Sequence, residues 1–174
     1  MSLRVSFDLS DKDLEHFTLI MHEARKATVG LAPEDIVAEA EALLHAMGES
    51  DSPGFIAERI QKLRLMIQML SDVEWRLPHQ DATRVLNALA YFSEPEDLIP
   101  DGIPGLGYLD DAIMIELVVR ELNHEIDAYE NFCEFRNSAR ASSDSNAVVG
   151  REEWLDERRN ELQSQMRRRR KKKR

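Results

Sequence analysis

The chain has 174 residues, of which 43% are hydrophobic and 32% are charged, a composition typical of one globular domain with an appendage. No run of about 18 uncharged apolar residues is present, which argues against a simple membrane-spanning helix. The first residues lack the apolar segment of a signal peptide. Cys133 is the single cysteine and cannot form an internal disulfide. We therefore expect a protein of a reducing compartment, the cytoplasm.

The net charge of −10 is unevenly distributed. The last eight residues are all basic, so the preceding 166 residues hold 15 basic and 33 acidic side chains, a formal charge of −18. We call residues 1–166 the acidic body. This uneven distribution of charge affects which partners the protein binds and how soluble it is, and it does not indicate the fold.

Apolar residues recur at helical spacing along most of the chain, and no segment of useful length alternates with the period of a strand. Ser10 with Asp13 resembles a capping box and predicts a helix that ends near Gly30. Pro33 suits the first position of a second helix, which should end at Gly48. These signals predict two helices within the first 48 residues.

Three further helices are predicted in the middle of the chain. The third takes Ser52 as its N-cap and runs to about residue 77, and a shorter fourth helix spans about 82–92. The segment 93–107, SEPEDLIPDGIPGLG, cannot be regular, because three prolines and three glycines interrupt it. A fifth helix should begin near Asp110 and run to about residue 136.

The first turns of the fifth helix, AIMIELVV, are apolar nearly all round, so we expect Ile113, Ile115 and Val119 in the core. The chain is thus predicted to be all-α. A bundle of about five helices should span residues 10–137, followed by a flexible linker at 138–150 and a charged helix at 151–174.

The motifs of known catalytic sites are incomplete. The segment HEIDA begins like a zinc-protease helix, but Ala128 stands where the second histidine is needed. The segment GLGYLDD has Asp110 at the third glycine position of a dinucleotide loop, and no strand precedes it. The sequence therefore favours a non-enzymatic role without excluding an enzyme.

The candidate metal or acid–base site consists of five carboxylates: Asp97, Asp101, Asp110, Asp111 and Glu116. Clustered oxygens suit a hard divalent cation, and a carboxylate among apolar residues acquires a raised pKa that suits proton transfer. The structural alternative is that the aspartates cap a helix or form turns, while Glu116 pairs with Arg120. We favour the structural role and keep a metal-binding module or metal-dependent enzyme as the alternative.

The segment 91–122 resembles the core motif of the YkvA-like family, a bacterial and archaeal domain of unknown function. The signature D-L-I-P-D-x-I-P-x-x-G-Y-x-D-D falls on Asp97, Leu98, Ile99, Pro100, Asp101, Ile103, Pro104, Gly107, Tyr108, Asp110 and Asp111. The resemblance extends over about residues 82–122 and implies no agreed reaction. Many relatives have flanking membrane-spanning segments, which are not found in these 174 residues.

The polybasic tail is the candidate site for an anionic surface: Arg167, Arg168, Arg169, Arg170, Lys171, Lys172, Lys173 and Arg174. It could contact a nucleic acid, an anionic membrane surface, an acidic protein or the acidic body itself. Because it holds no apolar residue, we expect it to be mobile by itself, so that its deletion leaves the stability nearly unchanged.

The leading hypothesis is a non-catalytic cytoplasmic interaction or regulatory protein, in which a helical scaffold carries this tail. No cofactor is expected, apart from a divalent metal under the alternative hypothesis. The sequence leaves the oligomeric state open.

Overall fold

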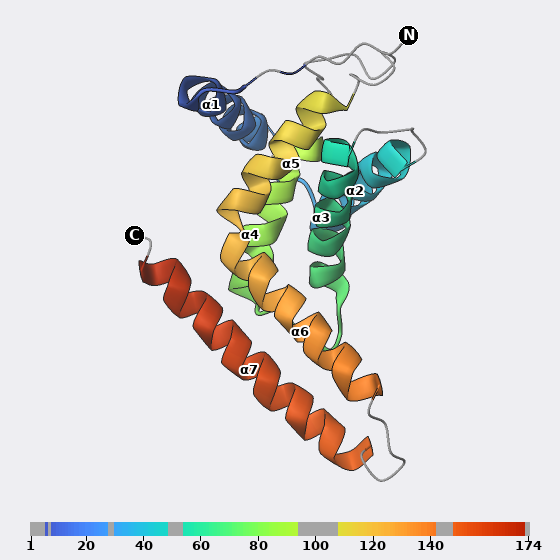
Figure 1. Cartoon of the computed structure of the whole chain (residues 1–174). Coiled ribbons are helices and arrows are strands. Elements are labelled where there is room, and N and C mark those ends of the chain that lie inside the picture. The colour runs from blue at the N-terminus through green and yellow to red at the C-terminus, as the bar shows by residue number, and fades with distance from the viewer. Residues whose placement is uncertain are drawn as a thin grey trace.

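The computed structural model describes residues 6, 8–27, 30–48, 54–93, 108–141 and 148–172. Every regular element among these residues is helical (Figure 1), in the order α1 (Asp11–Ala27), α2 (Pro33–Gly48), α3 (Gly54–Ser71), α4 (His79–Leu89), the short 3-10 helix η1 (Ala90–Ser93), α5 (Leu109–Glu121), α6 (Asn123–Ala141) and α7 (Val148–Lys172). The predicted all-α class is confirmed.

The helices pack around one apolar core. α3 lies between α2 and α5, while α4 and η1 pack on α2, and α1 covers η1 and the neighbouring part of α5. Ile113 and Ile115 are buried as predicted, and Val119 is half-buried and packs against the core. The apolar start of the fifth predicted helix is therefore central to the fold.

The predicted capping box begins α1. The backbone N–H of Ser10 donates to the Asp13 carboxylate at 2.8 Å, and the N–H of Asp13 donates to the Ser10 hydroxyl oxygen at 3.3 Å. The next helix, α2, ends at Gly48 as predicted. Local signals of this kind involve residues a few positions apart, so they can be read directly from the sequence.

The single helix predicted over about 110–136 is two helices, α5 and α6, which are separated at Leu122. The backbone of Leu122 has φ −103° and ψ 20°, outside the α region, and α6 begins at Asn123. Leu122, Ile126 and Tyr129 are all buried, so the apolar stripe continues across the break. Hydrophobic spacing therefore could not reveal it. The described part of residues 10–137 holds six α-helices rather than five.

Helix α7 belongs to the helical body and is not an appendage. It runs antiparallel to α6 (Figure 1), and three of its apolar side chains are buried in the core: Leu155, Leu162 and Met166. Gln163 donates from Nε2 to the carbonyl oxygen of Trp75 at 2.8 Å. Since α6 extends to Ala141 and α7 begins at Val148, both ends of the predicted linker 138–150 are helical.

Asp72 joins the turn between α3 and α4 to α6. Its carboxylate accepts hydrogen bonds from the backbone N–H groups of Glu74 and Trp75, at 3.0 and 3.2 Å. It also accepts from the Tyr129 hydroxyl at 2.7 Å and from Nη1 of Arg136 at 2.8 Å. Trp75 is fully buried, with its ring centroid 5.6 Å from that of Tyr129. The Asp72 carboxylate thus connects the turn that contains the buried Trp75 to two side chains of α6, Tyr129 and Arg136.

Asp72 should make the stability depend on pH in the acid range. Burial raises the pKa of Asp72, but hydrogen bonds from Tyr129, Arg136 and the Trp75 amide outweigh burial and hold that pKa below its ordinary value. Asp72 therefore stabilises the fold above the unfolded-state pKa of about 3.9, and this contribution is lost as the pH falls through the lower folded-state pKa.

We expect Asp72→Asn to be less stable than the parent at neutral pH. The difference should shrink as the pH falls below about 4, the unfolded-state pKa of an aspartate, toward the lower folded-state pKa of Asp72. Urea denaturation of both proteins across this range measures the difference. A loss of stability that is as large in acid as at neutral pH would contradict the role of the ionised carboxylate.

Candidate functional site

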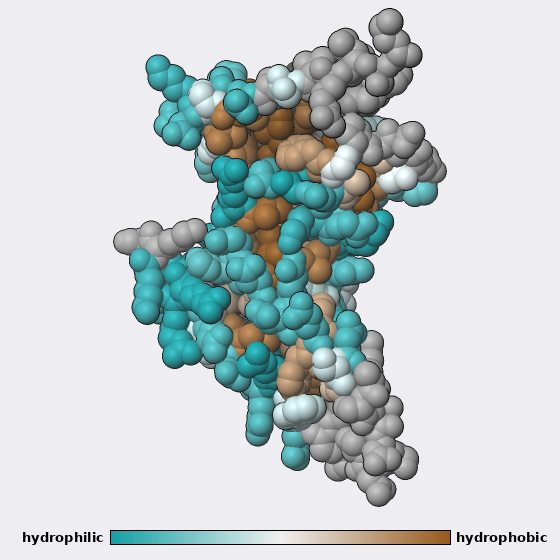
Figure 2. Space-filling view, in the orientation of Figure 1, coloured by the Kyte–Doolittle hydropathy of each residue, from teal (hydrophilic) through white to brown (hydrophobic). Residues whose placement is uncertain are grey.

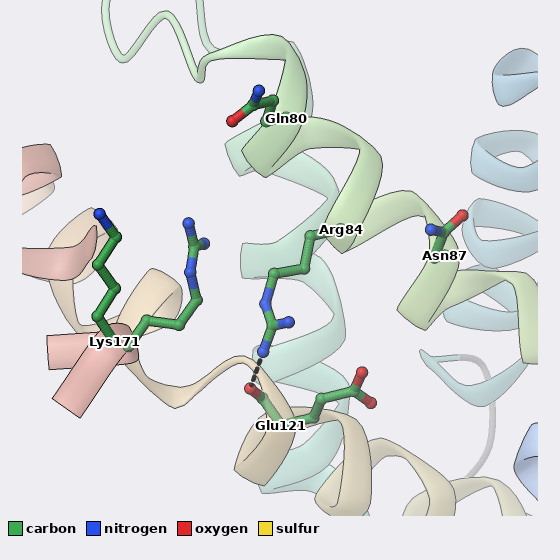
Figure 3. A pocket seen from close by; sticks show the side chains of 6 residues that line it. Gln80, Arg84, Asn87, Glu121 and Lys171 are labelled. Atoms are coloured by element: carbon green, nitrogen blue, oxygen red, sulfur yellow. Dashed lines mark hydrogen bonds between the residues drawn. The ribbon is translucent and has the colours of Figure 1, made fainter. Parts of the chain in front are cut away.

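A polar pocket of about 400 Å³ lies where α4, the end of α5 and the C-terminal end of α7 meet (Figure 3). It is lined by six polar side chains: Gln80, Arg84, Asn87, Glu121, Arg170 and Lys171. Three of them, Gln80, Arg84 and Asn87, are spaced by four and three residues and share one face of α4. Figure 3 shows the Lys171 side chain across the pocket from Arg84.

Two buried carboxylates are neutralised next to the pocket. Asp81 is 2% exposed and Glu125 is fully buried. Nη1 of Arg170 donates to Asp81 at 2.8 Å and to Glu125 at 2.9 Å, while Nε of Arg84 donates to the same Glu125 oxygen at 2.9 Å. Arg167 lies 3.6 Å from Asp81. A buried carboxylate without a cation is strongly destabilising, so the acidic body requires these arginines.

The eight cations of the polybasic tail do not have equivalent surroundings. Arg167 and Arg170 pair with the buried carboxylates, and Lys173 and Arg174 lie outside the described residues. The remaining four are exposed side chains of α7: Arg168, Arg169, Lys171 and Lys172.

The expectation that the tail is mobile is wrong for residues 167–172, because α7 continues through Lys172. Two physical causes support this order. Basic residues in the last turn complement the helix dipole. Burial lowers the pKa of Arg170, but the hydrogen bonds to Asp81 and Glu125 outweigh burial and raise that pKa, which is the signature of a cation held by its partners.

The predicted aspartate site is described only in part. Asp110 and Asp111 lie in the first turn of α5 and are 2% and 6% exposed. Neither is the N-cap, which is Tyr108, and the Tyr108 side chain makes no capping hydrogen bond. The negative charge of both aspartates in the first turn complements the helix dipole, and a capping role for their carboxylates stays a prediction. Asp97 and Asp101 lie outside the described residues.

Glu116, the fifth candidate carboxylate, is paired with arginines. Its two oxygens lie 2.7 Å from Nε of Arg59 and 3.1 Å from Nε of Arg120, which confirms the predicted pair along α5. Among the residues that the structure describes, no group of three or more His, Cys, Asp or Glu side chains could hold a metal ion. A metal site that includes Asp97 and Asp101 stays a prediction.

The buried carboxylates and their arginines form a charged cluster: Asp81, Arg84, Glu125, Arg167 and Arg170. The sequence interpretation missed three of these residues: Asp81, Arg84 and Glu125. A signal for Glu125 is present in the sequence, because it stands three residues after Leu122 and four before Tyr129, on the apolar stripe. A carboxylate on such a stripe needs a cation. The partner could not be identified, because Arg170 lies 45 residues away in the chain.

Comparison with known proteins identifies the family of this chain. The sequence model of the DUF1232 family, described as a protein of unknown function, matches residues 83–117. The uncharacterized membrane protein YkvA of Bacillus subtilis (strain 168) is 35% identical over 79 residues, which cover 42% of this chain and 73% of YkvA. The chain belongs to the DUF1232 family. No solved structure matches this DUF1232 chain.

The DUF1232 match confirms the resemblance that the L-I-P-D-x-I-P motif indicated. It covers most of α4 and α5, and thus Arg84, whereas Asp81, Glu125 and Arg170 lie outside the matched residues. The polar pocket is therefore formed by the matched DUF1232 segment together with residues that lie outside it. None of the helices described for this DUF1232 chain combines the length and the hydropathy of a membrane span.

Proposed function

We propose that this protein is a non-catalytic, cytoplasmic interaction protein that binds an anionic membrane surface through the C-terminal end of α7. The observation that carries the proposal is the ordered presentation of cations there. Arg167 and Arg170 anchor the end of α7 to the buried carboxylates Asp81 and Glu125. The intervening and following basic side chains are then held outward on a helix, and the surface at this end is hydrophilic in Figure 2.

A lipid surface fits these cations better than a nucleic acid does. The tail contains no aromatic residue, so it cannot stack on bases. The relative YkvA carries the name of a membrane protein, which supports a lipid surface as the partner. The charge of −18 on residues 1–166 repels any polyanion, so that contact would be confined to the end of α7.

The expected affinity is low. Each Lys or Arg near an anionic bilayer contributes about 1 kcal/mol, so four exposed cations supply about 4 kcal/mol, which corresponds to roughly millimolar binding. Such binding is reversible and strongly weakened by salt, because the charges are screened within about 10 Å at moderate ionic strength. Binding of this strength suits a protein that visits the membrane surface and leaves it.

Vesicle co-sedimentation tests the proposal. We expect the full chain at low salt to sediment with vesicles that contain phosphatidylglycerol and to remain in solution with phosphatidylcholine alone. A variant with the four exposed cations changed to Gln should lose the binding: Arg168, Arg169, Lys171 and Lys172. A matched control removes four exposed cations elsewhere: Lys12, Lys26, Arg64 and Arg120.

The control should bind like the parent, because its lost charges lie outside the proposed contact. Equal loss in both variants would contradict a specific role of α7, since net charge alone would then decide the binding. Binding of the parent to RNA but not to either vesicle would also overturn the proposal in favour of a nucleic-acid partner.

A further inference from the structure

The cations of the polar pocket retain hydrogen-bond donors. Arg170 uses Nη1 for the two buried carboxylates and forms no other hydrogen bond to a described residue, which leaves Nε and Nη2. Arg84 uses Nε for a buried carboxylate and Nη2 for the carbonyl oxygen of Glu121 at 3.1 Å, which leaves Nη1 (Figure 3). The exposed ammonium group of Lys171 makes no hydrogen bond to any described residue. All three side chains line the same space.

The pocket and its wall have an excess of positive charge. Glu121 is paired with Arg25 at 3.0 Å. The other two carboxylates are Asp81 and Glu125, and the cations that pair with them or line the pocket number four: Arg84, Arg167, Arg170 and Lys171. Among these six described residues, four positive and two negative charges leave an excess of two positive charges. The excess matches the charge of a doubly ionised phosphate monoester.

We propose that this pocket binds a phosphate monoester group. Guanidinium groups present paired N–H donors that match the oxygens of a phosphate, and the Lys171 ammonium adds a mobile point charge. The amides of Gln80 and Asn87 lie on the same face of α4 as Arg84 and can bind hydroxyl groups next to the phosphate. A volume of about 400 Å³ accommodates the phosphate together with a small group that carries it.

The phosphate can belong to a lipid headgroup or to a soluble ester. The lipid source rests on the proposed function, because it requires the end of α7 to lie at a membrane surface. A headgroup with a terminal phosphate monoester carries more charge than the diester of phosphatidylglycerol. The pocket therefore distinguishes two anionic lipids that the exposed cations alone would treat alike.

The test uses a variant that opposes phosphate without changing the size of any side chain. Gln80→Glu combined with Asn87→Asp places two carboxylates in the pocket, and both positions are exposed in α4. Gln61→Glu combined with Gln68→Glu is the matched control, since both glutamines are exposed in α3, away from the pocket. The two variants have the same net charge. Circular dichroism and thermal melting establish that each variant is folded.

Isothermal titration calorimetry with inorganic phosphate measures the pocket alone. We expect saturable binding to the full chain and to the control, and binding about tenfold weaker or more in the pocket variant, because the added carboxylates repel the anion. Absence of saturable phosphate binding to the parent overturns the inference. Equal affinity of the parent and the pocket variant also overturns it, since phosphate would then bind elsewhere.

Vesicle binding separates this inference from the proposed function. At equal surface charge, phosphatidic acid vesicles should bind the parent more tightly than phosphatidylglycerol vesicles, and the pocket variant should lose that preference. If phosphate binds in the pocket but no vesicle binds, the pocket stands and the proposed function fails. If both vesicles bind the parent equally and the pocket variant behaves like the parent, the lipid role of the pocket fails while the proposed function stands.

Discussion

Arg170→Ala should lower the free energy of unfolding by about 3 kcal/mol, the lower end of the range for removing one partner of a buried ion pair. Arg170 donates to Asp81 and Glu125 at 2.8 and 2.9 Å, and these carboxylates are 2% and 0% exposed. Without Arg170, Glu125 would keep Arg84 as its partner, and Asp81 would keep Arg167. The lower end applies because these two arginines still offset part of the charge.

Arg169→Ala is the matched control, because Arg169 stands next to Arg170 on α7 and is exposed. An exposed substitution of this kind should change the stability by no more than about 0.5 kcal/mol. Urea denaturation of the parent and both variants provides the measurement. If Arg170→Ala unfolds at the same urea concentration as the parent, the ion pairs of Arg170 with Asp81 and Glu125 do not contribute to the stability of the fold.

The same ion pairs change what truncation should do. The sequence alone predicts that deleting residues 167–174 leaves the stability nearly unchanged. Because the deletion removes Arg167 and Arg170 together, it should instead destabilise the protein at least as much as Arg170→Ala. A binding assay that uses the truncated chain would therefore confuse loss of a lipid contact with loss of folding. For this reason the proposed test changes only the exposed cations.

Ile115→Ala should lower the free energy of unfolding by about 2–5 kcal/mol, the range for creating a cavity in a packed core. Ile115 is fully buried in α5, with Ala112, Met114 and Val118 also fully buried around it in the same helix. The interior cannot collapse completely around the lost methyl and methylene groups, so the cavity adds to the lost hydrophobic burial. The urea denaturation midpoint and the melting temperature both report the change.

Val73→Ala is the comparison for Ile115→Ala, since Val73 is 81% exposed and its truncation leaves no cavity. We expect a change of no more than about 0.5 kcal/mol for it. A parent-like stability of Ile115→Ala would mean that the start of α5 is a contact face for a partner or a second copy. It would also contradict the core that the sequence and the structure both place there.

Much of the helical organisation could be predicted, and the particular residues explain why. Ser10 and Asp13 are three positions apart, and the hydrogen bonds between them begin α1. Helix α2 ends at Gly48. The apolar run that contains Ile115 indicated a central helix, which the burial confirms. The break at Leu122 was missed, because the apolar stripe continues through it without a change of period.

The charged cluster shows where prediction from the sequence ends. Asp81 and Arg170 are 89 residues apart, and nothing in their neighbourhoods in the sequence links them. The run of basic residues looked uniform, yet the helical turn directs Arg170 onto the buried carboxylates while Arg169 stays exposed. The predicted linker likewise gave no sign that α7 would fold back along α6.

The sequence by itself determined the all-α class, the ends of several helices and the family, because caps, periodicity and the L-I-P-D-x-I-P motif are local patterns. Only the tertiary structure decided which charges are buried, which cations remain exposed and that a polar pocket lies between α4 and α7. The physical reason is that burial depends on which helices meet. That outcome is set by the packing of the whole core and not by the spacing of residues within one helix.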